Sequence, residues 1–161
     1  MLDLAVVNGT VFLEGSFRKA DIGIKDGKFA LIAEPGTLPK AEKTIDAKGQ
    51  YVLPGGIDTH MHIRDPGHAE RGTFVTESRA AAAGGCTTYF EHPISVPPQH
   101  NPEILHHRMD LAKKGSTVDY CFFGAAGGDY LQDIVPLAKE GIIAYKTFLH
   151  QPPKGREKEF D

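Results

Sequence analysis

The first fifty residues alternate between short apolar runs and turn residues, a pattern typical of short β-strands. Strand candidates flank an Asn-Gly pair at residues 8–9, which is a strong signal for a two-residue hairpin turn. Further strand candidates flank an Asp-Gly pair at residues 26–27 and a Lys-Gly pair at residues 48–49. The pattern therefore predicts a small layer of antiparallel strands over residues 1–53.

From residue 54 onward, near-continuous apolar strands alternate with helical patterns. Thr73 and Asn101 are expected to cap the first two helices, and Asp133 the third. This alternation predicts a parallel α/β sheet with right-handed crossovers. The expected strands are residues 57–62, 86–90, 118–124 and 142–149, and the expected helices are residues 74–83, 102–114 and 129–139.

Two α/β architectures fit this order of elements: an open doubly wound sheet and a (β/α) barrel. A closed barrel needs eight strand–helix units and about 250 residues. The chain has 161 residues and only four of these strands. A barrel interpretation therefore implies that about half of a barrel is present.

Composition narrows the classes of function. The formal net charge is −3, so there is no basic excess to neutralise a nucleic-acid backbone. Hydrophobic residues make up 40% and charged residues 24%, which is ordinary for a globular protein. The two cysteines lie in apolar runs, and neither a secretory signal nor a membrane-spanning run is evident. A soluble, cytoplasmic protein without nucleic-acid or membrane partners is expected.

His60 and His62 form the first candidate for chemistry. They lie two residues apart on a predicted strand, so both imidazoles share one face and can reach one Zn, Fe, Co or Ni ion. Asp58 lies on the same face, where it could orient a histidine or add a carboxylate. Alternatively, the histidines merely end an exposed strand. Their position after the first strand of a parallel sheet, where the loops form the active face, favours metal ligands.

Lys146 is the second candidate, because it interrupts an otherwise apolar strand. Burying an ammonium group is costly, so such a lysine needs a reason. It could extend to water at the strand end or pair with a carboxylate. Near a metal cation it would have to be neutral or be converted to an anion.

Other polar residues follow the strand ends. Arg64, before Asp-Pro-Gly, could hold a substrate carboxylate with two hydrogen bonds, or could pair with Asp65 or Glu70. His92 and His150 follow the second and fourth strands, where each either touches a ligand or only ends its strand. These residues alone do not decide between the alternatives.

Three motifs together resemble the cyclic amidohydrolases, the group of dihydroorotases, allantoinases and hydantoinases. They are PGGIDTHMHIRDPG at residues 54–67, RAAAAGGCTT at residues 79–88 and YKTF at residues 145–148. The resemblance implies a metal-dependent (β/α)₈ barrel. Residues 54–161 would supply its first four strands and three helices, and residues 1–53 would be the N-terminal part of a small β-sandwich domain.

The resemblance also implies a site with two divalent metal ions, zinc being expected. His60 and His62 would be ligands of one ion, and Lys146 would carry a CO₂-derived carbamate that bridges both. A metal-bound hydroxide would attack a ring carbonyl and open a cyclic amide, either a ureide or an imide. Arg64 would bind the substrate carboxylate, and Asp58 would support the ligands.

Some expected parts have no counterpart in the sequence. The resemblance implies later histidines and a general-base aspartate, which are expected beyond Asp161, so no catalytic base is assigned within the chain. We therefore expect an incomplete portion of an enzyme, with little activity alone, whose full-length form is a homo-oligomer. His92-Pro93 stands where dihydroorotases carry Met-Pro-Asn, which leaves the substrate open. The alternatives are a non-catalytic structural homologue and a small α/β binding protein.

Overall fold

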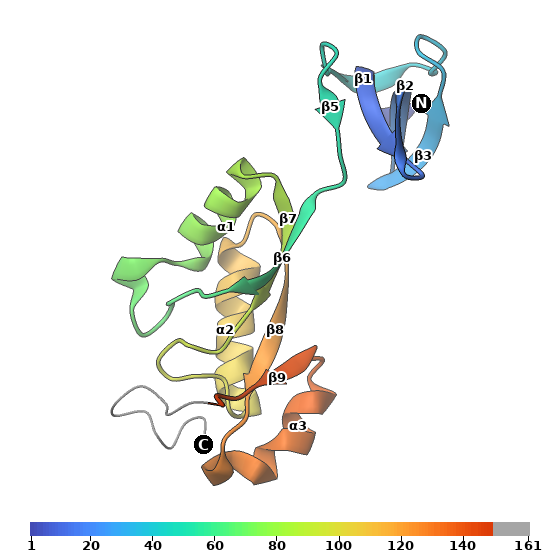
Figure 1. Cartoon of the computed structure of the whole chain (residues 1–161). Coiled ribbons are helices and arrows are strands. Elements are labelled where there is room, and N and C mark those ends of the chain that lie inside the picture. The colour runs from blue at the N-terminus through green and yellow to red at the C-terminus, as the bar shows by residue number, and fades with distance from the viewer. Residues whose placement is uncertain (150–161) are drawn as a thin grey trace. The chain divides into compact units, whose positions relative to one another are not determined.

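The structure is a computed structural model that describes residues 1–149. The chain divides into two compact units, Met1–Pro54 and Gly55–Asp161, which are coloured blue to green and green to red in Figure 1. The division falls within one residue of the boundary that the sequence predicts. Each unit is described by itself.

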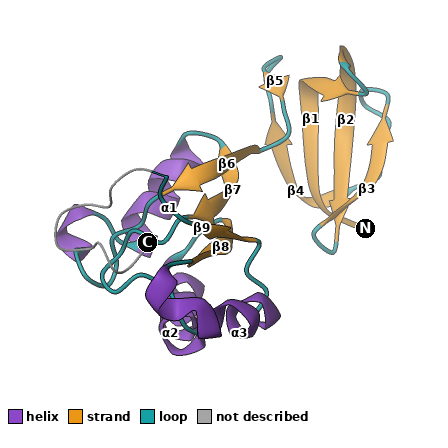
Figure 2. Ribbon diagram, turned by 60° about the horizontal axis from the view of Figure 1, so that its bottom comes forward, coloured by secondary structure: helices purple, strands orange, loops and turns teal. Residues whose placement is uncertain are grey.

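The first unit is a five-stranded sheet (Figure 2). Strands β1, β2 and β3 form an antiparallel meander, and β4 and β5 pair parallel to β1. A small apolar core gathers around Val11, Ala20 and Ile22. The strands are β1 (Leu2–Leu13), β2 (Ser16–Lys25), β3 (Lys28–Ala33), β4 (Ala41–Asp46) and β5 (Tyr51–Val52).

The hairpin predicted at Asn8-Gly9 is wrong. β1 runs straight through this pair, and the register to β2 shifts between Val6 and Gly9, which marks a β-bulge. Asn8 has a positive φ of 59°, and its backbone N–H donates to the Asp21 carboxylate at 2.9 Å instead of closing a turn. The reversal comes later, between Leu13 and Ser16, where Glu14 and Gly15 have positive φ. The residues that favour a tight turn serve the bulge instead.

The turn predicted at Lys48-Gly49 is present, but it does not make a hairpin. β4 and β5 do not pair with each other; both follow the same edge of β1. The Gly49 N–H donates to the Asn8 carbonyl at 2.8 Å, so the turn lies directly opposite the bulge. The hairpin predicted at residues 26–27 is confirmed, with positive φ at both central residues.

The second unit confirms the predicted strand–helix alternation, although the strand predicted at residues 142–149 covers only Ala144–Lys146. Its four strands are parallel and hydrogen-bonded in the order β6-β7-β8-β9. This is a curled sheet of the kind found in part of a (β/α) barrel (Figures 1 and 2). The elements are β6 (Gly56–Met61), α1 (Phe74–Ala83), β7 (Cys86–Glu91), α2 (Pro102–Gly115), β8 (Asp119–Ala125), α3 (Ile134–Lys139) and β9 (Ala144–Lys146), with short 3₁₀ helices at Ala69–Arg71 and Gly128–Asp133.

The helix starts follow the sequence closely. Thr73 caps α1 by accepting a hydrogen bond from the Thr76 N–H, and Asn101 caps α2 by accepting one from Ile104. The third helix begins at Ile134 with Asp133 at its N-cap position, as predicted, but the Asp133 side chain makes no capping hydrogen bond. The helix is shorter than the predicted range 129–139, because Gly128–Asp133 form a 3₁₀ segment. Across residues 1–149, no helix is both long enough and apolar enough to cross a membrane.

The apolar core shows which side of the parallel sheet meets the helices. Phe74 of α1, Leu105 of α2 and Leu137 of α3 pack in one cluster with Tyr89 of β7 and Phe122 of β8. Met61 and Tyr145 join this cluster from β6 and β9. Because successive side chains alternate along a strand, the neighbours of these residues face the opposite side of the sheet.

Candidate metal centre

His60 and His62 converge at the carboxyl end of β6. Their Nε2 atoms are 3.2 Å apart, and their ring planes cross at 81°. Two nitrogens bound to one tetrahedral zinc ion at 2.0–2.1 Å lie about 3.3 Å apart, so this spacing fits a shared cation. The structure therefore brings together the two rings that their i, i+2 spacing predicts to share one face.

Hydrogen bonds position the His62 imidazole and the His60 backbone. His62 Nδ1 faces the His92 carbonyl oxygen at 3.4 Å, so the Nδ1–H donates there and the Nε2 lone pair is left for a cation. Asp58 Oδ1 accepts a hydrogen bond from the His60 backbone N–H at 3.0 Å. Asp58 therefore supports His60 through the strand backbone at this contact.

The His92 ring packs face to face against the His60 ring. The two rings stack in parallel with centroids 4.0 Å apart, and the other face of His92 stacks on Phe123 of β8, also at 4.0 Å. His92 Nε2 bonds the Thr59 carbonyl at 3.0 Å, which joins β7 to β6. The sequence left His92 undecided; its place two residues beyond Phe90, on the same face of the strand, was the available signal.

The imidazoles of His62 and His92 are expected to make the free energy of unfolding depend on pH. Burial, with nearby positive charges, lowers the pKa of His62 and His92 below the ordinary 6.5. The unfolded chain therefore binds more protons than the folded chain just below this pH, so stability falls as pH falls through the window. Urea unfolding at about pH 7.5 and about pH 5.5 should show a lower free energy of unfolding at the acidic value. A His62→Asn/His92→Asn variant should lose part of this slope, and an identical slope would contradict the assignment.

Lys146 lies on the same side of the sheet as the histidines. Its neighbour Tyr145 packs into the core on the helix side of the sheet, so Lys146 faces the opposite side. Lys146 pairs in register with Ala125 of β8. Its positive charge contributes to the lowered pKa of His92. The Nζ atom lies 5.2 Å from the centroid of the Phe148 ring. Lys146 and the imidazoles thus come from the two outer strands of the sheet to one face.

Arg64 extends from the loop after β6 toward the loop after β7. Its Nη1 donates to the Ile94 carbonyl oxygen at 3.5 Å, and the side chain is half-buried. The two loops touch closely, since a Cβ placed on Gly67 would lie 2.2 Å from the Val96 oxygen. The Asp-Pro-Gly sequence therefore needs glycine at this position for the loop to stay where it holds Arg64. Glu70, one alternative partner, accepts from His68 at 3.3 Å.

A buried ionic network that the sequence analysis missed lies on the helix side of the sheet. Arg108 of α2 and Glu91 of β7 are both fully buried and form an ion pair at 2.8 Å. Gln99 donates to the same carboxylate, also at 2.8 Å. Arg108 follows Leu105 and precedes Ala112 at helical spacing, so its place on the apolar face could have been found from periodicity.

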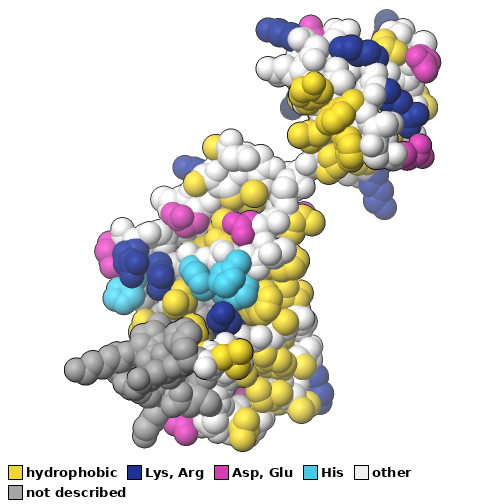
Figure 3. Space-filling model, viewed as in Figure 1, with side chains coloured by type: hydrophobic (Ala, Val, Ile, Leu, Met, Phe, Trp, Pro, Cys, Tyr) yellow, Lys and Arg dark blue, Asp and Glu magenta, His cyan; other side chains and the backbone are white. Residues whose placement is uncertain are grey.

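The donor set fits a metal ion only in part. Figure 3 shows histidines gathered on one face of the second unit, with a basic side chain beside them. Within residues 1–149, no three His, Cys, Asp or Glu side chains are grouped closely enough to hold a metal. Two imidazole nitrogens are therefore present, and a further ligand would have to come from a modified Lys146 or from elsewhere. His150 lies outside the described residues.

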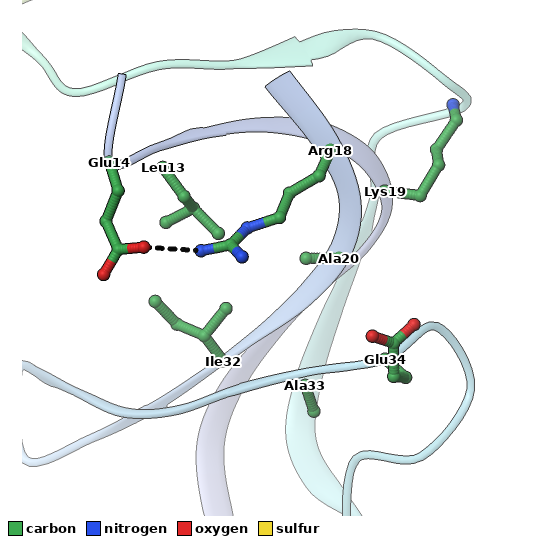
Figure 4. A pocket seen from close by; sticks show the side chains of 8 residues that line it. All are labelled: Leu13, Glu14, Arg18, Lys19, Ala20, Ile32, Ala33 and Glu34. Atoms are coloured by element: carbon green, nitrogen blue, oxygen red, sulfur yellow. Dashed lines mark hydrogen bonds and ion pairs between the residues drawn. The ribbon is translucent and has the colours of Figure 1, made fainter. Parts of the chain in front are cut away.

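The first unit carries a hollow of a different kind (Figure 4). Glu14 and Arg18 form an ion pair of 3.4 Å across it, and both side chains are largely exposed. Solvent weakens such a pair, and no imidazole or thiol lines the hollow. The convergent chemistry of the described residues lies in the second unit.

Comparison with known proteins relates this arrangement to a class. A solved L-hydantoinase (dihydropyrimidinase) from Arthrobacter aurescens superposes with a TM-score of 0.90 at 33% identity, over 100% of this chain and 35% of that chain. A solved D-hydantoinase gives a TM-score of 0.76 at 32% identity, over 96% of this chain and 34% of that chain. The second unit thus has the architecture of part of a hydantoinase-type (β/α) barrel.

Sequence comparison finds relatives in the same group of enzymes. An allantoinase from Bacillus velezensis is 38% identical over 148 residues, which is 91% of this chain and 32% of that protein. A dihydroorotase from Methanosarcina mazei is 32% identical over 165 aligned positions, which is 100% of this chain and 36% of that protein. No family model matches the sequence. Over at least 91% of its length the chain is similar to cyclic amidohydrolases named allantoinase, dihydroorotase and hydantoinase, and it spans about a third of the length of these relatives. The resemblance seen in the motifs is confirmed.

Proposed function

We propose that the chain supplies the first half of an active site that hydrolyses the ring amide of a cyclic ureide or imide. The observation that carries the proposal is the pair of His60 and His62 Nε2 atoms, 3.2 Å apart at the end of the first barrel strand, with Lys146 on the same face. Relatives named allantoinase, dihydroorotase and hydantoinase support the substrate class. Because the chain matches about a third of each relative, the remaining ligands and the general base would come from outside these 161 residues.

The proposed roles follow from chemistry at named atoms. His60 and His62 would hold a divalent ion, zinc by expectation, through their Nε2 lone pairs. When bound, two such ions would supply Lewis-acid activation of water and of the ring carbonyl. The His62 Nδ1–H stays on the His92 carbonyl and keeps the Nε2 lone pair directed at the ion.

Lys146 would serve as an anionic oxygen ligand after carboxylation. The neutral Nζ attacks the carbon of CO₂, an N–C bond forms, and one proton leaves the nitrogen to solvent, which leaves a carbamate anion. This step removes the conflict between an ammonium and a nearby cation. Its support is the half-buried place of Lys146 on the imidazole side of the sheet.

Arg64 is proposed to bind a carboxylate on the substrate ring. In the full-length protein, Arg64→Lys should raise KM for a carboxylated ring such as dihydroorotate by about tenfold or more, because an ammonium cannot make the two parallel hydrogen bonds of a guanidinium. The KM for the uncarboxylated ring of hydantoin should change little, which provides the control. An unchanged KM for the carboxylated ring would remove the proposed role.

The full-length protein that carries this segment tests the proposal as a whole. Supplied with zinc and bicarbonate, it should open the ring of at least one of three compounds: allantoin, hydantoin and dihydroorotate. Chromatography of the product would measure the ring opening. Lys146→Arg keeps the positive charge but cannot form the carbamate, and it should reduce kcat by more than about a hundredfold. Absence of ring opening by the metal-loaded protein over the whole panel would contradict the proposal.

A further inference from the structure

Arg108 uses its whole hydrogen-bonding capacity inside the second unit. The side chain is fully buried, and a guanidinium has five N–H donors. Nη1 donates to Glu91 at 2.8 Å and to Gln99 at 2.6 Å, and Nη2 donates to Glu91 at 3.0 Å and to the Ile63 carbonyl at 2.9 Å. Nε donates to the Asp65 carbonyl at 3.2 Å. All five donors are therefore matched to acceptors from separate segments of the chain.

Two of these acceptors belong to the loop that leaves the imidazole pair. The Ile63 carbonyl immediately follows His62, and the Ile63 and Asp65 carbonyls lie on either side of Arg64. These bonds join the α2 helix to the backbone of the loop at two points two residues apart. They fix the position of the backbone where it leaves β6. The side chains of His62 and Arg64 extend from this stretch of backbone.

The other acceptors reach the strands beside the imidazoles. Glu91 is the last residue of β7 and directly precedes His92, whose ring stacks on His60. Gln99 donates a second hydrogen bond to the Phe123 carbonyl at 2.9 Å, and Phe123 stacks on the other face of His92. One buried network therefore contacts the ends of β6, β7 and β8 from the helix side of the sheet.

Stability alone is a weak reason for this arrangement. Burying an ion pair costs desolvation energy, and apolar residues of similar size often stabilise a protein as well or better. The Arg108 side chain also passes near two aromatic rings, Phe74 at 5.4 Å and Phe122 at 5.9 Å, so the site is otherwise apolar. An apolar side chain would fill the space, but it could not bond two carbonyls at defined positions.

We infer that Arg108 is a positioning residue, which with Glu91 holds residues 63–65 so that His62 and Arg64 are placed for their ligands. The inference deepens and rests on the proposed function, because it assigns a purpose to the network through that site. Arg108 itself lies on the opposite side of the sheet from the imidazoles, so it acts through the backbone of the loop.

The test uses a variant that removes both charges together. Glu91→Leu/Arg108→Met leaves no unpaired buried charge, so cooperative unfolding should be retained. Arg108→Lys is the second variant: it keeps a cation beside Glu91, but one ammonium cannot reach all five acceptors. His106→Gln is the matched control on the same helix, since His106 is exposed and bonds Glu140 at 2.7 Å. Each variant is made in the full chain of 161 residues.

Two readouts separate a positioning role from a structural one. Hydrogen exchange should speed up in residues 62–65 and near His92 in both network variants, with the α1 amides unchanged. Binding of Co²⁺, the probe ion, should weaken by about tenfold to a hundredfold, with altered visible absorption bands, whereas His106→Gln should match the wild type.

Exchange and Co²⁺ binding equal to wild type in both network variants would overturn the inference. Faster exchange spread evenly over the second unit would also overturn it, since that marks a general structural role. If the wild-type chain binds no Co²⁺, the proposed metal site fails, and the exchange data still decide whether Arg108 holds the loop. The two failures are therefore distinguishable.

Discussion

Replacing His60 and His62 together with alanine is expected to weaken the binding of divalent metal by this chain more than about a hundredfold. Their two Nε2 atoms, 3.2 Å apart, supply both nitrogen donors of the candidate centre. Mutation of a group that only supports a metal ligand lowers metal affinity about tenfold to a hundredfold. Removal of two ligands should therefore lower the affinity by more than about a hundredfold. Titration calorimetry with Zn²⁺ and absorption spectroscopy with Co²⁺ would measure the change.

The matched control for this experiment is the pair of exposed histidines at positions 68 and 106. His68 bonds Glu70 and His106 bonds Glu140, both away from the imidazole pair, so His68→Ala/His106→Ala should bind metal as the wild type does. A similar loss in the control would indicate nonspecific surface binding. Unchanged binding after removal of His60 and His62 would refute the centre.

The single substitution Arg108→Met should destabilise the second unit by about 3–5 kcal/mol. It leaves the Glu91 carboxylate fully buried without its cation and removes the donors to the Ile63 and Asp65 carbonyls. Urea unfolding followed by circular dichroism would measure the loss. The double variant Glu91→Leu/Arg108→Met should recover most of it, because no buried charge then lacks a partner.

The pH dependence of the Arg108→Met loss gives an independent check. Burial raises the pKa of the Glu91 carboxyl, and the Arg108 charge opposes that rise. Without Arg108, the folded state favours protonated Glu91, so the loss should be largest near neutral pH and should shrink as pH falls. A loss that is small at neutral pH, or that grows toward acidic pH, would contradict the role of the pair.

The parallel unit was predictable because its local signals agree with its packing. Thr73 and Asn101 cap their helices as expected, and apolar strands alternate with helices in the order that a barrel requires. In the first unit, local and long-range preferences conflict. Asn8-Gly9 has the intrinsic preference for a hairpin, but pairing with β2 over the length of β1 outweighs it and leaves a bulge.

The candidate centre was predictable only where spacing defines geometry. The separation of two residues on a strand was sufficient to bring His60 and His62 together. The contacts of His92 and Arg108 depend on which strands and helices become neighbours, so their roles could not follow from sequence spacing alone. The resemblance to cyclic amidohydrolases named a role for Lys146, and the register of β9 against β8 adds its position on the sheet.

Anomalous diffraction at the zinc edge tests the central claim most directly, using crystals of the chain grown with Zn²⁺ and bicarbonate. A shared zinc site should give an anomalous peak about 2.0–2.1 Å from the Nε2 atoms of both His60 and His62. Continuous density for a carboxylated Lys146 should be directed toward that peak. Well-ordered His60 and His62 rings without an anomalous peak between them, in crystals that bind zinc elsewhere, would refute a metal site at this imidazole pair.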